Sequence, residues 1–475
     1  FFGLMLDNIA GLILMVALLQ GFGFPVDFIV SAMVPGTALG VLIGDLAFFV
    51  LAFWLAKRTG RDDVTAMPLG LDTPSTFGII LFILGPSYLQ GVGTMGLSEQ
   101  DAAYRTWHIG IWCIVMSGAL KFVLAPFTEI VRRVIPRAGL LGSLAAIALV
   151  LISFIPLMEI FRHPLPGMIA LVIVLSALVG RIPLPGRTPG TLGALLVASI
   201  VFYAMCFIPG THYEYPTAPT GTSWFPTQWL EAWQFNWISD FDDALAYLPI
   251  ALPFAIGTVV GGIDCTESAA AAGDEYDTRT VIGVEAFATV IAGFSGGVIQ
   301  TTPYIGHPAY KAMGGRAAYT LGTALLIGSA GLVGYFGWIN AYLPAATVYP
   351  ILVFVGLEIT AQSFLATPRK HYAAVALACL PALAFLAMSF PGQMFGDAAL
   401  RDAGIELSTL QDSLLQTNLK TVGMLSSGFI ITSLLWAWAL AKIVDREIKV
   451  AALVMALAGG LTAFGIIHSP LPGNQ

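Results

Sequence analysis

The sequence predicts an all-α polytopic membrane protein that is built from two related halves. Of its 475 residues, 57% are hydrophobic and only 10% are charged, whereas a soluble domain has about 25% charged residues. Long apolar runs separated by short polar loops predict about fourteen membrane spans, with Val450–Ile467 as a candidate extra span. Two segments rich in proline and glycine interrupt this pattern, one in each half of the chain.

The first interruption is Ala66–Ile83, which follows two spans that carry the buried acids Asp7 and Asp45. Its sequence, AMPLGLDTPSTFGIILFI, places proline and glycine around Asp72 and Thr73 before a short apolar run. Proline disfavours the interior of a helix but is tolerated in its first turn, so a helix is expected to begin at Pro74. The segment therefore predicts a short strand that leads into a half-helix. Irregular backbone at membrane depth is tolerated only around a buried site or a cavity.

The second half opens with a span that contains VVGGIDCTESAAAAG, Val259–Gly273. Asp264, Thr266 and Glu267 lie together in this apolar helix, where a central carboxylate costs roughly 2.5–3.5 kcal/mol. The two acids are three residues apart and share a helix face. The small residues around them allow close approach of another backbone or of a ligand. This stretch predicts the floor of a polar site, and the next span adds a further buried acid, Glu285.

The second interruption is Gln300–Met313, QTTPYIGHPAYKAM, in which proline and glycine surround His307. It resembles the first interruption, and each follows two spans of which the first carries a buried acid. Seven spans per repeat require opposite orientations of the two halves. Inverted repeats with paired broken helices are typical of secondary transporters, whose site lies at the midplane. The sequence thus predicts a 7+7 inverted-repeat fold with two half-helices, whose N-termini face each other, and short strands at the midplane.

The loops sort by charge. The acidic and Trp-rich loops fall on one predicted side of the membrane. Five basic loops fall on the other side: Lys57–Arg61, Arg132–Arg137, Arg181–Arg187, Arg369–Lys370 and Lys442–Lys449. By the positive-inside rule the basic side and the N-terminus are cytoplasmic, in the inner (plasma) membrane. Leu4–Leu19 lacks the features of a cleaved signal and is expected to stay as the first span. Trp229, Trp233 and Trp237 predict an aromatic stripe on an interfacial helix.

Five regions follow from this organisation. We expect each half to contribute one part to a core domain and one part to a gate domain. A Trp-rich extracellular loop is expected between the two halves. In chain order these are 1–126 (core, spans 1–4), 127–208 (gate, spans 5–7), 209–243 (loop), 244–340 (core, spans 8–11) and 341–475 (gate, spans 12–14 with the extra segment).

The layout resembles the nucleobase–ascorbate transporter family, with its xanthine, uracil and adenine/guanine permeases and the uracil-transporter fold. The resemblance rests on Ala66–Ser75, on Asp264–Gly273, in which Asp264 takes the acidic position of the base-binding motif, and on Phe287–Arg316. In that last segment His307 takes a position that is usually acidic or Gln, and Pro308 replaces an Asn. The resemblance implies symport of a purine or pyrimidine, coupled to protons or sodium, and a dimer through the gate domain.

The candidate residues divide into two groups. Those expected to bind substrate come from the two interruptions and from the acidic helix: Asp72, Thr73, Asp264, Thr266, Glu267, Gln300, Thr301, Thr302 and His307. Those expected to carry the coupling cation are buried acids, which burial makes suitable proton carriers: Asp7, Asp45, Asp264, Glu267 and Glu285. Apart from the coupling proton or sodium ion, no cofactor or metal is expected.

The predicted function is symport of a small polar heterocycle by alternating access. Two alternatives stay open. One is an anion transporter or exchanger for sulfate, bicarbonate or an organic acid, favoured by helix dipoles and His307. The other is a channel or a receptor. The sequence has no metal-ligand spacing, nucleophile elbow or phosphate-binding loop, so we do not expect an enzyme. The expected partners are a small-molecule substrate and the lipid bilayer, without nucleic acid.

Overall fold

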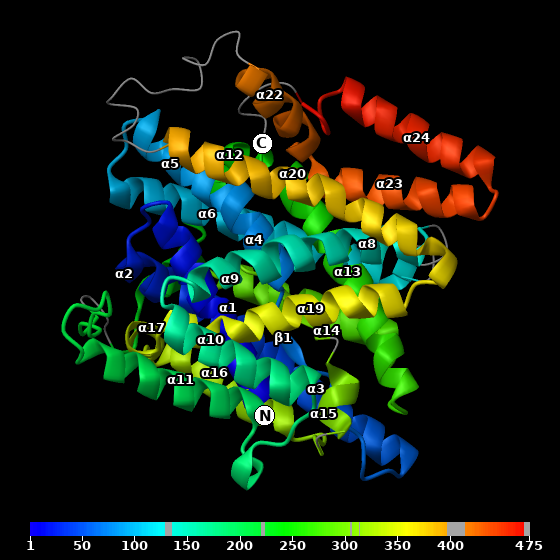
Figure 1. Ribbon diagram of the computed structural model, residues 1–475. Helices are drawn as coiled ribbons and strands as arrows, with labels where there is room; N and C mark the ends of the chain where they lie inside the picture. The colour runs from blue at the N-terminus through cyan, green and yellow to red at the C-terminus, as the bar shows by residue number, and fades with distance from the viewer. Residues whose placement is uncertain (129–134, 220–223, 305, 313, 397–413, 470–475) are drawn as a thin grey trace. The chain divides into compact units, whose positions relative to one another are not determined.

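The computed structural model describes residues 1–128, 135–219, 224–304, 306–312, 314–396 and 414–469 (Figure 1). Part of the predicted basic loop Arg132–Arg137 lies outside these residues. The described chain is mainly helical and contains one sheet of two short strands. It separates into two compact units, 1–131 with 156–354 and 132–155 with 355–475. Both short strands belong to the first unit.

The first unit contains most of the helices and both strands. Its elements up to residue 206 are α1 (Phe2–Gly21), α2 (Val26–Phe28), α3 (Val34–Thr59), β1 (Leu69–Leu71), α4 (Thr73–Ile79), α5 (Gly85–Gly93), α6 (Glu99–Leu124), α9 (Phe154–Ile160, which begins at the boundary), α10 (Pro164–Val174) and α11 (Gly190–Cys206). The rest are α12 (Phe241–Leu245), α13 (Leu248–Ala271), α14 (Thr278–Phe294), β2 (Thr301–Pro303), α15 (His307–Ala312), α16 (Tyr319–Leu332), α17 (Phe336–Tyr342) and α18 (Ala345–Val348).

The second unit is a helical bundle. Its elements are α8 (Arg137–Ile147), α19 (Pro350–Leu365, which begins in the first unit), α20 (Tyr372–Gly396), α22 (Leu414–Ser426), α23 (Phe429–Val444) and α24 (Ile448–Ala463). Its core is lined by alanines on α8, α20 and α23, which allow these helices to pack closely. A second apolar cluster joins α23 to α24.

The predicted fold class is confirmed: the chain has the architecture of a 7+7 inverted-repeat transporter fold. Among the described residues, eight helices are long and apolar enough to cross a bilayer, and two bent helix pairs reach this length together. The bends are 91° between α16 and α17 and 71° between α22 and α23. Three shorter apolar helices, α10 with its π-helical extension, α11 and α24, have 10–17 residues. The candidate extra span is thus a helix of 16 residues, Ile448–Ala463.

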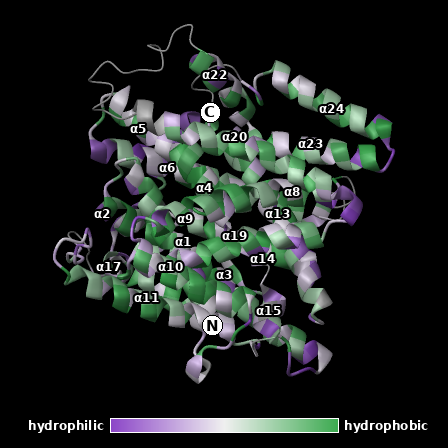
Figure 2. Cartoon of the chain, in the orientation of Figure 1, coloured by the Kyte–Doolittle hydropathy of each residue, from purple (hydrophilic) through white to green (hydrophobic). Residues whose placement is uncertain are grey.

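The surface agrees with a membrane environment. Apolar residues cover most of the helices, and polar residues concentrate in the loops (Figure 2). Large apolar residues such as Phe53, Val172 and Leu453 are at least half exposed. Such exposure is costly in water but favourable against lipid. The chain is therefore a multi-pass membrane protein.

The predicted interfacial helix with a Trp stripe is wrong. Instead, two short 3-10 helices, Gln228–Gln234 and Asn236–Asp240, meet at Phe235, whose positive φ of 59° breaks the helical path. The break turns Trp237 inward, where it is buried against Trp112, while Trp233 stays exposed. The loop therefore packs on α6 by its last tryptophan and does not present three on one face.

Candidate functional site

The two interruptions meet as a short antiparallel sheet inside the first unit. Leu69 pairs with Pro303, Gly70 with Thr302 and Leu71 with Thr301. The backbone pairing continues at both ends, since Asp72 N donates to Gln300 O at 2.9 Å and Tyr304 N donates to Pro68 O at 2.8 Å. Two segments related by an inverted repeat run in opposite directions, so an antiparallel pair is the expected arrangement.

The antiparallel pairing places the two following helices at opposite ends of the sheet. α4 begins beside Gln300, whereas α15 begins after Pro303, beyond the end at which Pro68 pairs with Tyr304. The two helix N-termini are therefore separated by about the length of the strands, on the order of 10 Å for three residues. The sequence predicts that the two N-termini face each other, and the pairing places one of them at each end of the sheet.

Side chains from α1 and α3 satisfy the outer edge of β1. Asp45 Oδ1 accepts a hydrogen bond from Leu69 N at 3.2 Å, and Asn8 Oδ1 accepts one from Leu71 N at 3.1 Å. Asn8 Nδ2 donates to Leu4 O at 3.0 Å and makes a longer contact, 3.5 Å, with Leu69 O. Backbone groups at a sheet edge need partners where water is scarce. Asn8 and Asp45 supply them.

The outer edge of β2 is satisfied from the other side. Thr289 Oγ1 lies 3.3 Å from Thr301 N, and Lys121 Nζ donates to Thr301 O at 3.0 Å. Lys121 also forms an ion pair of 2.8 Å with Glu285, and both side chains are fully buried. Cys265 of α13 donates from Sγ to Pro303 O at 3.3 Å. Three helices, α6, α13 and α14, therefore hold this edge of the sheet by side chains that lie inside the unit.

The start of α4 is closed by Asp72. Its Oδ2 accepts a hydrogen bond from Ser75 N at 2.8 Å, which is an N-cap, and Pro74 follows within the first helical turn. Asp72 and Thr73 are both buried. This part of the sequence prediction, an extended segment that enters a helix at Pro74, matches the geometry.

Gln300 lies beside this cap. Its side chain is fully buried, and neither its amide nitrogen nor its amide oxygen has a hydrogen-bond partner among the described residues. Leaving a buried polar group unsatisfied costs about 1–3 kcal/mol, so such groups are rare in stable folds. The amide of Gln300 is thus available to a small polar ligand at the end of the sheet where α4 begins.

The predicted acids on α13 lie on a helix that contacts β2. Asp264 and Glu267 are half-buried, and Thr266 is buried but donates its hydroxyl to its own helix, at Ile263 O (2.7 Å) and Gly262 O (3.0 Å). Asp7, another predicted acid, is buried. Its carboxylate lies next to β1: a Cβ built on Gly70 would be 3.6 Å from Asp7 Oδ2. Thr302 stands opposite Gly70 in the sheet.

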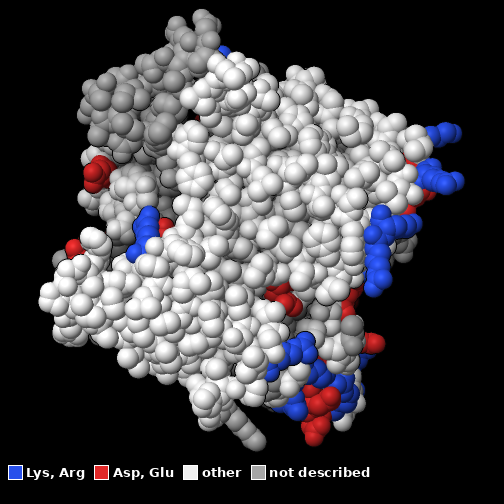
Figure 3. Space-filling model, in the orientation of Figure 1, with Lys and Arg blue, Asp and Glu red and all other residues white. Residues whose placement is uncertain are grey.

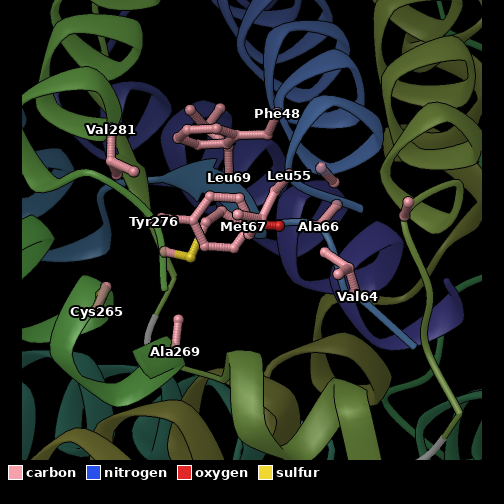
Figure 4. Close-up of a cluster of buried hydrophobic side chains, with 12 residues drawn as sticks. Phe48, Leu55, Val64, Ala66, Met67, Leu69, Cys265, Ala269, Tyr276 and Val281 are labelled. Atoms are coloured by element: carbon pink, nitrogen blue, oxygen red, sulfur yellow. The ribbon is translucent and has the colours of Figure 1, made fainter. Parts of the chain in front are cut away.

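The backbone that leads into β1 is held by an apolar cluster (Figure 4). Val64, Ala66 and Met67 are buried against residues of α3, α13 and α14, including Phe48, Cys265 and Val281. The cluster reaches Leu69, the first residue of β1, and Tyr276 also belongs to it. This packing positions the strand relative to α13.

His307 lies in a different place from the other candidates. It is fully buried, and its Nε2 lies 3.1 Å from Thr65 O and 3.3 Å from Asp274 Oδ2. Asp274 is also buried and pairs with Lys311 at 2.6 Å and with Arg61 at 3.1 Å. We call Arg61, Asp63, Asp274, His307 and Lys311 the ion-pair cluster; its exposed charges gather near α15 and the end of α3 (Figure 3).

The ion-pair cluster joins the loops that follow α3 and α13 to the helix α15. Arg61 hydrogen-bonds the exposed carboxyl of Asp63 and lowers the pKa of that group to about 2. Tyr276 donates its hydroxyl to Thr65 O at 2.6 Å, and burial raises the pKa of Tyr276. The cluster therefore fastens the ends of α3, α13 and α15 to one another.

Sequence reasoning gave no role to Asn8, Lys121 or Asp274. A signal was present for Lys121, because a lysine inside an apolar span needs an acidic partner, and Glu285 stands in a later span. Asn8 follows the candidate Asp7, but its role depends on a strand edge that only the folded chain provides. Asp274 lies in the loop after α13 and could have been paired with the basic residues near α15.

Comparisons with known proteins place few limits on the chain. No family model matches it, and no curated protein matches it. The transmembrane domain of a cyanobacterium bicarbonate transporter, BicA, is similar with a TM-score of 0.46 and 14% identity over 83% of this chain and 96% of that one. The structure of SLC26A9 is similar with a TM-score of 0.48 and 14% identity over 82% of this chain and 62% of that one.

The predicted membership of the nucleobase–ascorbate transporter family is wrong. The similar solved structures are a bicarbonate transporter and SLC26A9, and neither belongs to that family. The contacts explain why the motif misled: His307, counted into the acidic position of the substrate motif, contacts Asp274 and Thr65 in the ion-pair cluster. The stretch Phe287–Arg316 shares its proline and glycine spacing with the family because it also forms a broken element.

Proposed function

We propose that the chain is a secondary transporter that carries a small anion across the membrane by alternating access. The observation that carries this proposal is the fully buried and unsatisfied amide of Gln300 beside the N-cap of α4. It lies where two broken elements from opposite halves meet, which is the position of substrate sites in inverted-repeat transporters. A helix N-terminus favours negative charge, and an amide N–H adds a donor.

The buried acids at first argue against an anion. However, three of them already have partners within the protein: Asp72 caps Ser75 N, Asp45 accepts from Leu69 N, and Glu285 pairs with Lys121. Lys121 offsets the charge of Glu285, and the backbone hydrogen bonds of Asp72 and Asp45 occupy one carboxylate oxygen of each. We therefore assign Asp45 and Glu285 to holding the sheet, in place of the cation coupling that the sequence suggested.

Asp7, Asp264 and Glu267 are the acids that we expect to bind a coupling cation. Asp7 is buried beside β1, and Asp264 and Glu267 are half-buried on α13. Binding a proton or a sodium ion there would neutralise charge as an anion enters, so that the pair crosses with little net charge. Thr73 and Thr302 are the hydroxyl groups that we expect near the substrate, together with Gln300.

A neutral polar heterocycle is the second candidate substrate. Both ends of the Gln300 amide lack partners among the described residues, and a glutamine amide can donate to and accept from one flat ring edge. The two candidate substrates differ in what they require of Gln300. An anion needs only the N–H donor of the amide, whereas a heterocycle can use both the donor and the carbonyl acceptor.

The test is transport and binding by the full chain in liposomes. Purified protein is screened for stabilisation and for uptake with bicarbonate, sulfate, small carboxylates and neutral heterocycles, at two pH values, with and without sodium. Gln300→Met keeps the side-chain volume and removes the amide. It should weaken substrate binding by at least about 10-fold, the value of one hydrogen bond to a charged group.

Thr323→Val is the matched control. Thr323 is also fully buried and its hydroxyl also lacks a partner among the described residues, but it lies on α16, which packs against α3 and α1. Its binding should equal that of the wild type. Uptake of neutral heterocycles but not of anions would overturn the anion proposal in favour of the second candidate substrate. Conduction that does not depend on a proton or sodium gradient would indicate a channel and not a secondary transporter. The N-terminus in the cytoplasm and the homodimer stay predictions.

A further inference from the structure

Lys121 lies in the last turn of α6 and is fully buried. Its ammonium contacts three oxygen atoms: Glu285 Oε1 at 2.8 Å, Thr301 O at 3.0 Å and Thr289 Oγ1 at 3.4 Å. These are one carboxylate, one backbone carbonyl and one hydroxyl. None of them belongs to α6, which contributes only the lysine.

The oxygen atoms form a site that does not depend on α6 for its shape. Glu285 and Thr289 are one turn apart on α14, and Thr301 is the first residue of β2. Thr289 Oγ1 also lies 3.1 Å from Thr301 Oγ1, which ties the helix to the strand. A Cβ on Gly262 would lie 2.9 Å from Glu285 Oε2, so α13 closes the other side of the carboxylate. Carboxylate, carbonyl and hydroxyl oxygens are the donors that hard cations prefer.

We infer that the ammonium of Lys121 is a built-in cation in an oxygen-lined site, which a free monovalent cation would fill if the lysine were shortened. The lysine then has two consequences. It neutralises Glu285 without an ion from solution, and it prevents external cations from binding at this end of β2. This inference concerns cation binding and does not rest on the proposed transport function.

A purely structural ion pair is the alternative. In that case the ammonium only fastens β2 to α14, and the space that a shorter side chain leaves holds no ion. The two readings differ in one measurable quantity, which is the dependence of stability on the identity of the cation after the lysine is removed. Mass action requires a ligand of the folded state to raise its melting temperature.

The experiment uses the full chain in detergent with four proteins: the wild type, Lys121→Ala, Lys121→Met and Lys121→Ala combined with Glu285→Gln. Melting temperatures are measured in sodium, potassium and choline chloride at equal ionic strength. Lys121→Ala should gain several degrees in sodium or potassium over choline, beyond any shift of the wild type. Lys121→Met, whose side chain still fills the space, and the double variant, which lacks the carboxylate, should show only the wild-type shift.

An equal shift in all four proteins would overturn the inference, because the cation would then act elsewhere. So would a Lys121→Ala protein that is destabilised to the same extent in every salt. If Lys121→Ala is recovered folded only when sodium or potassium is present during purification, the inference is supported; failure to fold in every salt, while the double variant folds, counts against it.

Discussion

Single side chains decide whether the sheet can exist inside the membrane. Each strand has three residues, and the second strand can satisfy only one edge of the first. The other edge depends on Asn8 and Asp45, which come from helices on the far side of β1. At the residue scale these two side chains therefore replace the neighbouring strands of a larger sheet.

Asp45 allows this role to be separated from charge. Asp45→Asn keeps an oxygen in place of Oδ1, so it should still accept from Leu69 N, whereas Asp45→Leu should leave that N–H unsatisfied at a cost of about 1–3 kcal/mol. Thermal unfolding in detergent should therefore give a normal melting temperature for the amide and a lower one for leucine. Equal melting temperatures for the two variants would contradict this role, because the hydrogen bond to Leu69 N would then make no difference to stability.

At the scale of elements, close helix approach depends on glycine. A Cβ on Gly36 of α3 would overlap Ser295 O and Gly297 N, which are backbone atoms that cannot rotate away. Ser295–Gly297 form the turn between α14 and the approach to β2. The position of this turn, and with it of Gln300, depends on the absence of a side chain on α3.

Gly36→Ala should therefore destabilise the protein by at least about 1–3 kcal/mol through overpacking, seen as a lower melting temperature or as less folded protein by size-exclusion chromatography. Gly261→Ala, on α13, is the control, because a Cβ there meets no described atom within 4 Å. Alanine is also the better helix former, so the control should be at least as stable as the wild type.

The elements were more predictable than their contacts. Proline and glycine around Asp72 and His307 predicted both broken segments because these residues limit backbone geometry locally. The role of Asn8 could not be assigned, since it depends on a strand edge that only the folded chain provides, whereas the charges of Lys121 and Asp274 called for partners of opposite charge. The Trp stripe failed because a four-residue spacing indicates one face only if the segment is α-helical, and Phe235 breaks it. Proline spacing does not reveal which end of a sheet a residue occupies, so the contacts of His307 with Thr65 and Asp274 could not be predicted.

At the scale of the whole molecule, charges outside the spans contribute to the dependence of stability on pH. Asp445, in the loop between α23 and α24, lies 2.8 Å from His371 Nε2 and pairs with Lys370. These hydrogen bonds lower the pKa of Asp445 in the folded protein. Ionised Asp445 therefore stabilises the fold above the pKa of an unfolded Asp, about 3.9, and this contribution is lost as the pH falls through the lowered value.

Asp445→Asn should accordingly have a lower melting temperature than the wild type at pH 7, and the difference should shrink below about pH 4. Most of the Lys370 side chain is exposed, so the difference at pH 7 should be small and should fall in high salt. The measurement is a set of paired melting curves from pH 3 to pH 7. A difference that grows as the pH falls would contradict this explanation.

The contacts of β1 also bear on how the chain is made. A ribosome releases the chain from its N-terminus, so β1 reaches the membrane long before β2 has been synthesised. The side chains that bind its outer edge, Asn8 and Asp45, precede it in the chain and enter first. The opposite edge waits for Thr301–Pro303, whose own polar partners Lys121, Cys265 and Thr289 have also been synthesised by then. Each strand thus follows its helical supports in the order of synthesis, and the sheet can close only after β2 has been made.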